Sequence, residues 1–206
     1  MSKLTDAREY VGGLSNPSKM PCKAYSIPAQ ECKVGSKLRL VAGSVCSACY
    51  ALKGRYTFPN VENALYRRFA TLDRQYWVEN MAVAINGAEF FRWHDSGDIQ
   101  NLKHLCRICA VCELTPDTRH WLPTREVAIV REYLKANPSG FPENLIVRVS
   151  ANMVDARTPN FAHTSTVDTR DRVAGYRCPA NTQEGKCGDC RSCWNSEVST
   201  VSYPLH

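Results

Sequence analysis

The sequence predicts an α/β fold, a small or partial (β/α) barrel, with a cysteine-rich metal-binding module at its C-terminal end. Short apolar segments typical of strands alternate with segments of helical periodicity from residue 24 to residue 150. Such alternation implies parallel strands joined by right-handed crossovers. The alternation ends near Asp155, and the cysteines become frequent after that point. We therefore expect a barrel-like domain with an N-terminal cysteine loop over residues 1–155, and a cysteine-rich segment packed on it over residues 156–206.

The individual elements follow from apolar periodicity and from residues that start or stop helices. Pro59 opens a helix, and Asn60 is a candidate N-cap. The residues at the chain's end, 201–206, are expected to form a short strand or extended tail that returns to the first strand. Strands are expected at 24–27, 89–94, 120–122 and 145–150, and helices at 60–72, 77–85, 101–114 and 127–135.

Composition and charge narrow the class of protein. Hydrophobic residues make up 44% of the 206 and charged residues 22%, which is ordinary for a globular protein. No apolar run approaches the roughly 18 residues that a membrane span needs, and residues 1–10 contain no signal-peptide core. We expect a cytoplasmic protein. The formal net charge of +6 gives weak support for nucleic acid as a partner, because the basic residues are scattered.

The cysteine content points to metal binding. Disulfides are rare in a cytoplasm, yet the chain contains eleven cysteines. Their number is odd and most of them are separated by short gaps, a pattern that favours metal ligation.

The C-terminal cysteines give the strongest signal. Cys178 precedes a proline, and Cys187, Cys190 and Cys193 follow in a C-x₂-C-x₂-C run. This run is the core of ferredoxin motifs that bind iron–sulfur clusters, usually of the [4Fe–4S] type. A structural zinc ion held by four thiolates is the alternative.

The N-terminal cysteines form a group of three. Cys32, Cys46 and Cys49 would leave one iron of a cubane open for a substrate or for a fourth ligand. Cys22 is either that fourth ligand or a spare thiol, and with it the group would also suit zinc.

A third run, Cys106, Cys109 and Cys112, has the same spacing but lies in a predicted helix. These cysteines share one stripe of the helix, so we expect them to be small core residues.

Polar residues follow two of the predicted strands, where α/β proteins carry their chemistry. We expect a ligand-binding site there, and His94 or Asp98 is a candidate fourth ligand of the N-terminal cluster. Asp98 could instead be the N-cap of the next helix. No NTPase, esterase or zinc-protease motif is present, so the catalytic residues are unknown. The candidate ligand-binding residues are His94, Asp95, Ser96, Asp98 and Arg125.

Five motifs carry a family resemblance: Lys23–Cys32, Val45–Tyr56, Phe91–Asp98, His120–Glu126 and Val201–His206. With them the sequence resembles the phage-encoded "gene product eighty-eight" family, over most of residues 20–206. That family has no settled function, so the resemblance implies a viral protein of a host cytoplasm and no particular activity.

A looser similarity is to the radical S-adenosylmethionine enzymes. These enzymes place three cysteines after the first strand of a partial TIM-like barrel and a Gly-rich acidic turn after the second. Cys32, Cys46 and Cys49, and the turn Ser96–Asp98, match those places, although thirteen residues separate the first two cysteines instead of three. The similarity implies S-adenosylmethionine as a possible cofactor.

The resulting expectation is a phage-encoded iron–sulfur protein with one or two clusters, acting as a redox or binding module. The alternatives are a radical S-adenosylmethionine-like enzyme with a small molecule at the open iron, and a zinc-stabilised nucleic-acid-binding protein.

Overall fold

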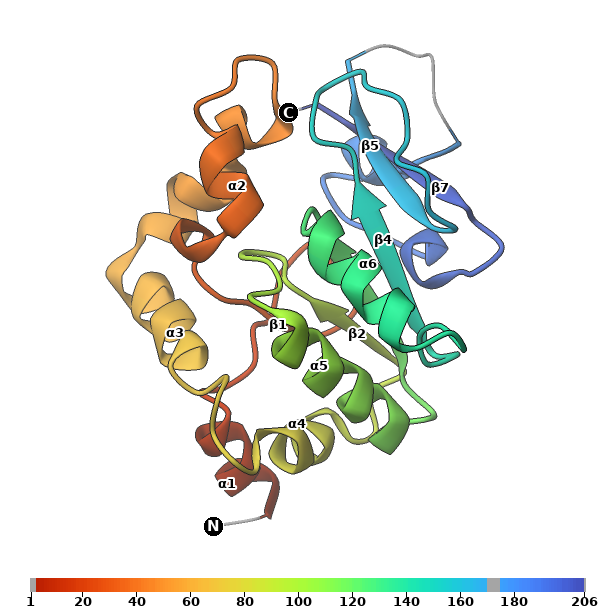
Figure 1. The fold of residues 1–206 in the computed structure, drawn as a ribbon. Coiled ribbons are helices and arrows are strands. Elements are labelled where there is room, and N and C mark those ends of the chain that lie inside the picture. Colours follow the sequence, from red (N-terminus) through yellow and green to blue (C-terminus); the bar gives the residue numbers. More distant parts are fainter. Residues whose placement is uncertain (1–2, 170–174, 206) are drawn as a thin grey trace.

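The computed structural model describes residues 3–169 and 175–205 and is built on one seven-stranded sheet (Figure 1). Every pair of neighbouring strands is parallel, in the order β1-β2-β3-β4-β5-β7-β6. The α/β class is thus confirmed. The strands are β1 (Ala24–Tyr25), β2 (Phe90–Trp93), β3 (Arg119–Thr124), β4 (Leu145–Ser150), β5 (Thr164–Asp168), β6 (Tyr176–Arg177) and β7 (Thr200–Pro204).

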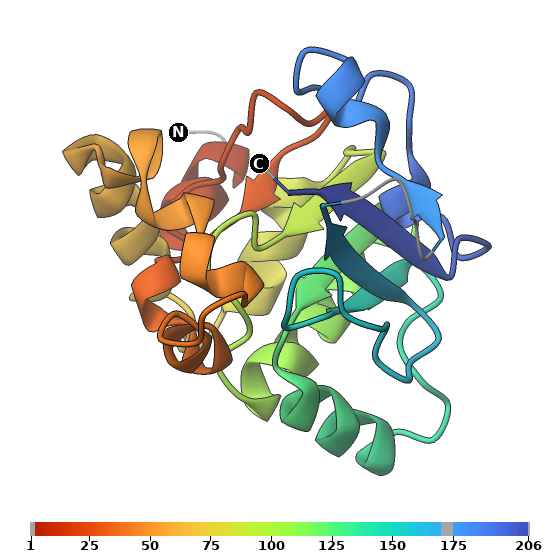
Figure 2. The same ribbon diagram turned by 90° about the horizontal axis from the view of Figure 1, so that it is seen from above.

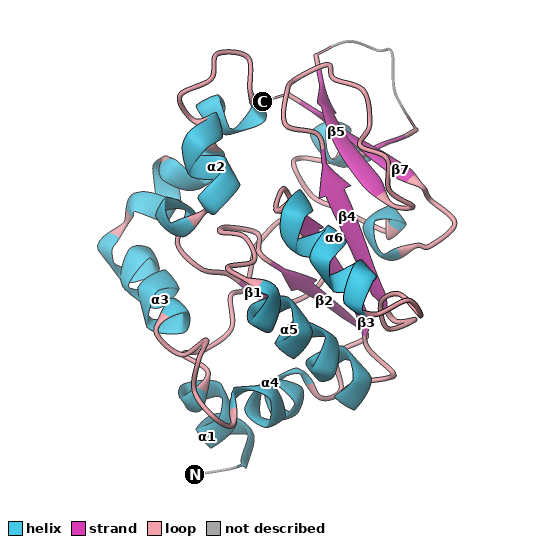
Figure 3. Ribbon diagram, in the orientation of Figure 1, coloured by secondary structure: helices cyan, strands magenta, loops and turns pink. Residues whose placement is uncertain are grey.

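The helices lie mainly along one side of the sheet, as Figure 3 shows for α5 and α6. They are α1 (Lys3–Tyr10), α2 (Lys33–Leu38), α3 (Pro59–Phe69), α4 (Trp77–Ile85), α5 (Leu102–Leu114) and α6 (Val127–Ala136). Asn60 is not the N-cap of α3, because Pro59 already occupies the first helical position and Phe58 precedes it as the cap residue.

The main core lies between α4, α5, α6 and one face of the sheet. Phe91 and Trp93 of β2 face this core, as do Val147 and Val149 of β4. This alternation of side chains is the ordinary consequence of the strand pleat.

Two of the three cysteines of α5 belong to this core. Cys109 and Cys112 are 3% and 0% exposed and confirm the expectation of core cysteines. Cys106 is exposed, so the prediction was wrong for that residue, which lies on the outer side of α5.

The opposite face of the sheet is covered by the cysteine-rich C-terminal segment (Figure 2). Phe90 and Trp121 project from β2 and β3 into a second core, where they meet Trp194. The Trp194 indole Nε1 donates to the Phe91 carbonyl at 2.8 Å. The sheet therefore has an apolar layer on each face, as a mostly parallel sheet requires.

The end of the chain does not return to the first strand. β7 lies between β5 and β6, and within residues 3–169 and 175–205 the edges of the sheet are β1 and β6. The expected pairing with the first strand was therefore wrong for residues 201–205, and residue 206 lies outside the described part. No helix in the described ranges has the length and apolar character of a membrane span.

Candidate metal centres and ligand site

The three N-terminal cysteines lie on a loop that spans residues 29–58. Cys32 immediately precedes α2, Cys46 lies in the short 3-10 helix Val45–Ala48, and Cys49 follows that helix. The two thiols of Cys32 and Cys46 meet at Gly35 of α2. A Cβ at that glycine would stand 3.6 Å and 3.7 Å from their Sγ atoms, and only 2.9 Å from the Cys32 Cβ. A side chain at residue 35 would therefore displace the Cys32 Cβ, whereas both Sγ atoms would be in ordinary van der Waals contact with it.

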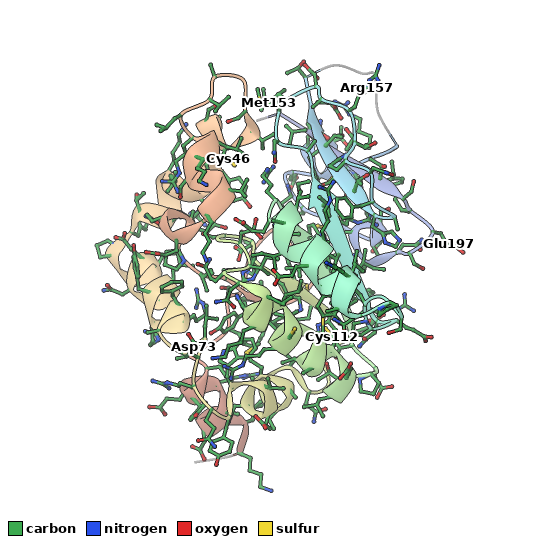
Figure 4. All side chains as sticks on the ribbon, in the orientation of Figure 1. Cys46, Asp73, Cys112, Met153, Arg157 and Glu197 are labelled. Atoms are coloured by element: carbon green, nitrogen blue, oxygen red, sulfur yellow. The ribbon has the colours of Figure 1, made fainter. Side chains whose placement is uncertain are left out.

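Three hydrogen bonds tie this loop to the segments that follow β2, β3 and β4. The Val45 amide donates to the Asn152 carbonyl at 2.9 Å, beyond the end of β4. The Val34 amide donates to Glu126 Oε1 at 2.8 Å, just before α6. Tyr56 Oη donates to the Asp95 carboxylate at 2.7 Å. The N-terminal cysteine group therefore stands at the carboxyl edge of the sheet, where Figure 4 shows Cys46 beside α2.

Burial is the main influence on these thiols. It raises the pKa of Cys32 and of Cys46 above that of an ordinary thiol, and the Asp98 carboxylate adds to the effect. Arg39 acts in the opposite direction on both thiols, and Arg125 does so on Cys46. Without a bound metal these thiols are therefore protonated at neutral pH, and metal binding would displace their protons.

Asp98 joins the loops that follow β2 and β3. Its carboxylate accepts from the Ile99 amide at 2.8 Å, from Thr124 Oγ1 at 2.6 Å and from the Arg125 amide at 2.9 Å. Burial raises its pKa to about 6. The alternative of an N-cap was wrong for Asp98, because Asn101 caps α5 by accepting from the His104 amide.

The turn after β2 contains buried polar groups that find no hydrogen-bond partner among the described residues. His94 is 3% exposed and both of its ring nitrogens are unpartnered. The same holds for Asp95 Oδ1 and Ser96 Oγ. Buried polar groups normally have partners, so unpartnered groups gathered in one turn favour a ligand or water at this place.

The backbone of this turn is strained at His94, whose φ is +53°. Its ring lies edge-on to His104 of α5, with 5.3 Å between the ring centroids. Burial lowers the pKa of His94 well below the ordinary value, so the ring is neutral at pH 7. Gly97 completes the turn with a φ of +79° beside Ile27.

Arg125 stands at the end of β3, next to Asp98. Its guanidinium Nε is buried without a partner among the described residues. Its positive charge also acts to lower the pKa of Cys46. Arg125 is therefore close to both the polar turn and the N-terminal cysteines.

The C-terminal cysteines lie against the opposite face of the sheet. The Cys178 amide donates to the Ser202 carbonyl of β7 at 2.8 Å. Cys193 lies in the short 3-10 helix Ser192–Trp194, and its Sγ is 3.2 Å from Tyr203 Oη. Cys190 Sγ is 3.5 Å from Tyr176 Oη and 3.5 Å from Ser192 Oγ.

Arg148 anchors this segment to the sheet. The side chain projects from β4, is 0% exposed, and donates to five carbonyl oxygens. Its shortest contacts are to the carbonyls of Ser192 at 2.9 Å, Asn195 at 3.0 Å and Cys193 at 3.1 Å. One buried guanidinium thus satisfies the carbonyl groups around the last cysteine.

The thiols of the C-terminal group differ in acidity. Burial raises the pKa of Cys193 to about 12 and also raises that of Cys187. Burial acts on Cys190 in the same direction, but hydrogen bonds with Ser192 and Tyr176 outweigh it and lower its pKa. Cys178 and Cys193 are both buried in the second core, which also contains Trp121 and Trp194.

The side chains of the described residues do not form a close single-ion site. No group of three or more His, Cys, Asp or Glu side chains in residues 3–169 and 175–205 is placed to hold one metal ion. The donors that the fold does gather are thiols, which are soft ligands suited to iron–sulfur clusters or zinc. The metal ligands expected from the sequence stay a prediction.

The comparisons with known proteins give one match. The model of the family described as Gene product 88 matches residues 2–196. The chain belongs to the Gene product 88 family. No curated protein and no solved structure matches. The phage family expected from the five motifs is therefore confirmed, and no match supports the looser similarity to radical S-adenosylmethionine enzymes.

Sequence reasoning missed two arginines that shape the sites of this Gene product 88 family member. Arg92 of β2 and Arg148 of β4 project from the sheet toward the C-terminal cysteines. The available signal was a charged residue inside an otherwise apolar strand, since such a residue needs a partner when it is buried.

Proposed function

We propose that this chain is an iron–sulfur protein with two cysteine-ligated sites and acts as a redox or binding module. Cys178, Cys187, Cys190 and Cys193 would hold one cluster against the sheet face. Cys32, Cys46 and Cys49 would hold a second cluster that keeps one iron open. An iron–sulfur cluster in such a site supplies one-electron chemistry.

One observation carries the proposal for the N-terminal site. The thiols of Cys32 and Cys46 meet at Gly35 on the carboxyl edge of a parallel sheet, beside buried polar groups without partners. In α/β proteins this edge is where small molecules bind. The unpartnered groups of Asp95 and Ser96 are suited to hold a small polar ligand next to the open iron.

The residues of the turn have separate parts in this proposal. Asp98 is already engaged by three hydrogen bonds, so it positions the loops and is a poor candidate for the fourth ligand. The His94 ring packs against His104 of α5. A small molecule is therefore favoured as the occupant of the open position.

The experiment is metal analysis of protein purified without oxygen. We expect a brown protein with about four to eight irons per chain, as one or two cubane clusters require. Cys46→Ala and Cys178→Ala should each remove roughly half of the iron and sulfide. Cys106→Ala is the matched control, since that cysteine is exposed on α5. Stoichiometric zinc without iron would refute the proposal.

A second candidate is an enzyme that binds S-adenosylmethionine at the open iron. The place of the cysteine loop after β1, and of the turn 95–98 after β2, favours it. Adding S-adenosylmethionine to reduced protein should then change the electron paramagnetic resonance signal. An unchanged signal, with no reductive cleavage of the added compound, would leave the redox or binding module as the function.

A further inference from the structure

The segment before β1 carries Cys22 away from the N-terminal cysteine group. Residues 15–24 form a long turn whose two ends are paired, because Ser15 and Ala24 exchange backbone hydrogen bonds of 2.7 Å and 3.0 Å. Cys22 precedes β1, whereas Cys32 follows it on the far side of Ile27. The strand therefore separates Cys22 from the carboxyl edge where the N-terminal group stands.

The C-terminal cysteine segment docks directly on this turn. The Cys187 amide donates to the Lys19 carbonyl at 2.9 Å. Cys22 packs against the second core, which contains the buried Cys178 and Cys193. The Cys187 thiolate is also among the charges that act on Cys22. A residue near the start of the chain thus lies with Cys178, Cys187 and Cys193 near its end.

Two arginines act on thiols of this group. Arg92 acts on Cys22, Cys187 and Cys193, and Arg191 acts on Cys22. The Arg92 guanidinium lies 4.4 Å from the Trp121 ring centroid, and its Nε is buried without a partner among the described residues. A neutral thiol that only fills a core has no need of such charges, whereas thiolates bound to a metal do.

We propose that Cys22 is a thiolate ligand of the C-terminal metal site, which draws its ligands from both ends of the chain. The identity of the metal rests on the proposed function, whereas the grouping of Cys22 with Cys178, Cys187 and Cys193 rests on the contacts above. In this site Cys22 takes the place that the proposed function gives to Cys190, whose Sγ is already hydrogen-bonded to Tyr176 and Ser192. A cubane with four thiolate positions then depends on Cys22 and tolerates the loss of Cys190.

The first measurement is chemical crosslinking of cysteines in the metal-free wild-type protein. A short bismaleimide should link Cys22 to Cys178, Cys187 or Cys193, as identified by mass spectrometry of the peptides. Links from Cys22 to Cys32, Cys46 or Cys49 would overturn the grouping. An unlinked Cys22 in a protein whose C-terminal cysteines do link to one another would overturn it as well.

The second measurement is the iron and sulfide content of Cys22→Ser, purified without oxygen, with Cys106→Ser as the matched control. Cys22→Ser should lose roughly half of the iron, as Cys178→Ala does, while the control keeps all of it. Full iron in Cys22→Ser would overturn the proposal. Wild-type protein without iron would refute the proposed function instead, and the crosslinks would then decide where Cys22 belongs.

Discussion

Replacement of Arg148 with methionine should detach the C-terminal cysteine segment from the sheet. Methionine keeps much of the apolar stem of arginine but donates no hydrogen bond. The carbonyls of Ser192, Asn195 and Cys193 would lose donors at 2.9 to 3.1 Å, and two further carbonyls would lose longer contacts.

The magnitude follows from burial. Hydrogen bonds to a charged group contribute about 1.5 to 3 kcal/mol each, so the three short ones alone would exceed about 4 kcal/mol. Burying the guanidinium costs several kcal/mol, which offsets part of that gain. We expect a net loss of about 3 to 5 kcal/mol, because three carbonyls lose close donors and each buried acceptor left without a donor costs about 1 to 3 kcal/mol.

Urea unfolding measures this loss through the midpoint at unchanged slope. Arg131→Met is the matched control, because Arg131 lies on the exposed side of α6 and should cost less than about 1 kcal/mol. Arg148→Met should also lose the iron of the C-terminal site. A destabilisation below about 1 kcal/mol would refute the role assigned to this arginine.

Two further predictions concern the turn after β2 and the helix that follows it. Gly97→Ala should cost about 3 kcal/mol, because the φ of Gly97 is +79° and the new Cβ would stand 2.3 Å from Ile27 Cγ1. Gly87→Ala, with a φ of +81° and open space around it, should cost only about 1 kcal/mol in the same urea measurement, and equal costs would contradict the steric argument. Burial lowers the pKa of His104 to about 3, so between pH 6 and pH 4 the unfolded chain binds a proton that the folded chain does not. The free energy of unfolding should therefore decrease by about 1.4 kcal/mol for each unit by which the pH is lowered, on account of this residue. His104→Gln should remove this pH dependence. If the variant keeps the same slope, His104 titrates normally in the folded protein.

Much of the fold was predictable because local patterns and tertiary packing agree. The strand at 145–150 was predicted at the limits that β4 has, since an apolar run of β-branched residues suits a strand covered on both faces. The strand order of β5, β6 and β7 was not predictable. These strands are short, lie among loops and cysteines, and pair through contacts that no local pattern encodes.

The candidate sites were predictable only in part. Residues at the ends of β2 and β3 were expected to meet, and the hydrogen bonds of Asp98 to Thr124 and Arg125 join those two ends. The place of Cys22 was not predictable. Its spacing from Cys32 suggested either a shared site or no site, whereas β1 carries the two residues to different places.

Arg92 acts electrostatically on both the C-terminal cysteine group and the polar turn beside the N-terminal group. Strand alternation sends Trp93 into the helical core and Arg92 to the face covered by the C-terminal segment. From there the charge of Arg92 acts on Cys187, and it also acts on Asp95, the carboxylate that holds Tyr56 of the N-terminal cysteine loop. A guanidinium keeps its charge when buried, so the arginine is a fixed positive centre between the polar turn and the C-terminal thiols. This one charge therefore contributes to the electrostatic potential of both places.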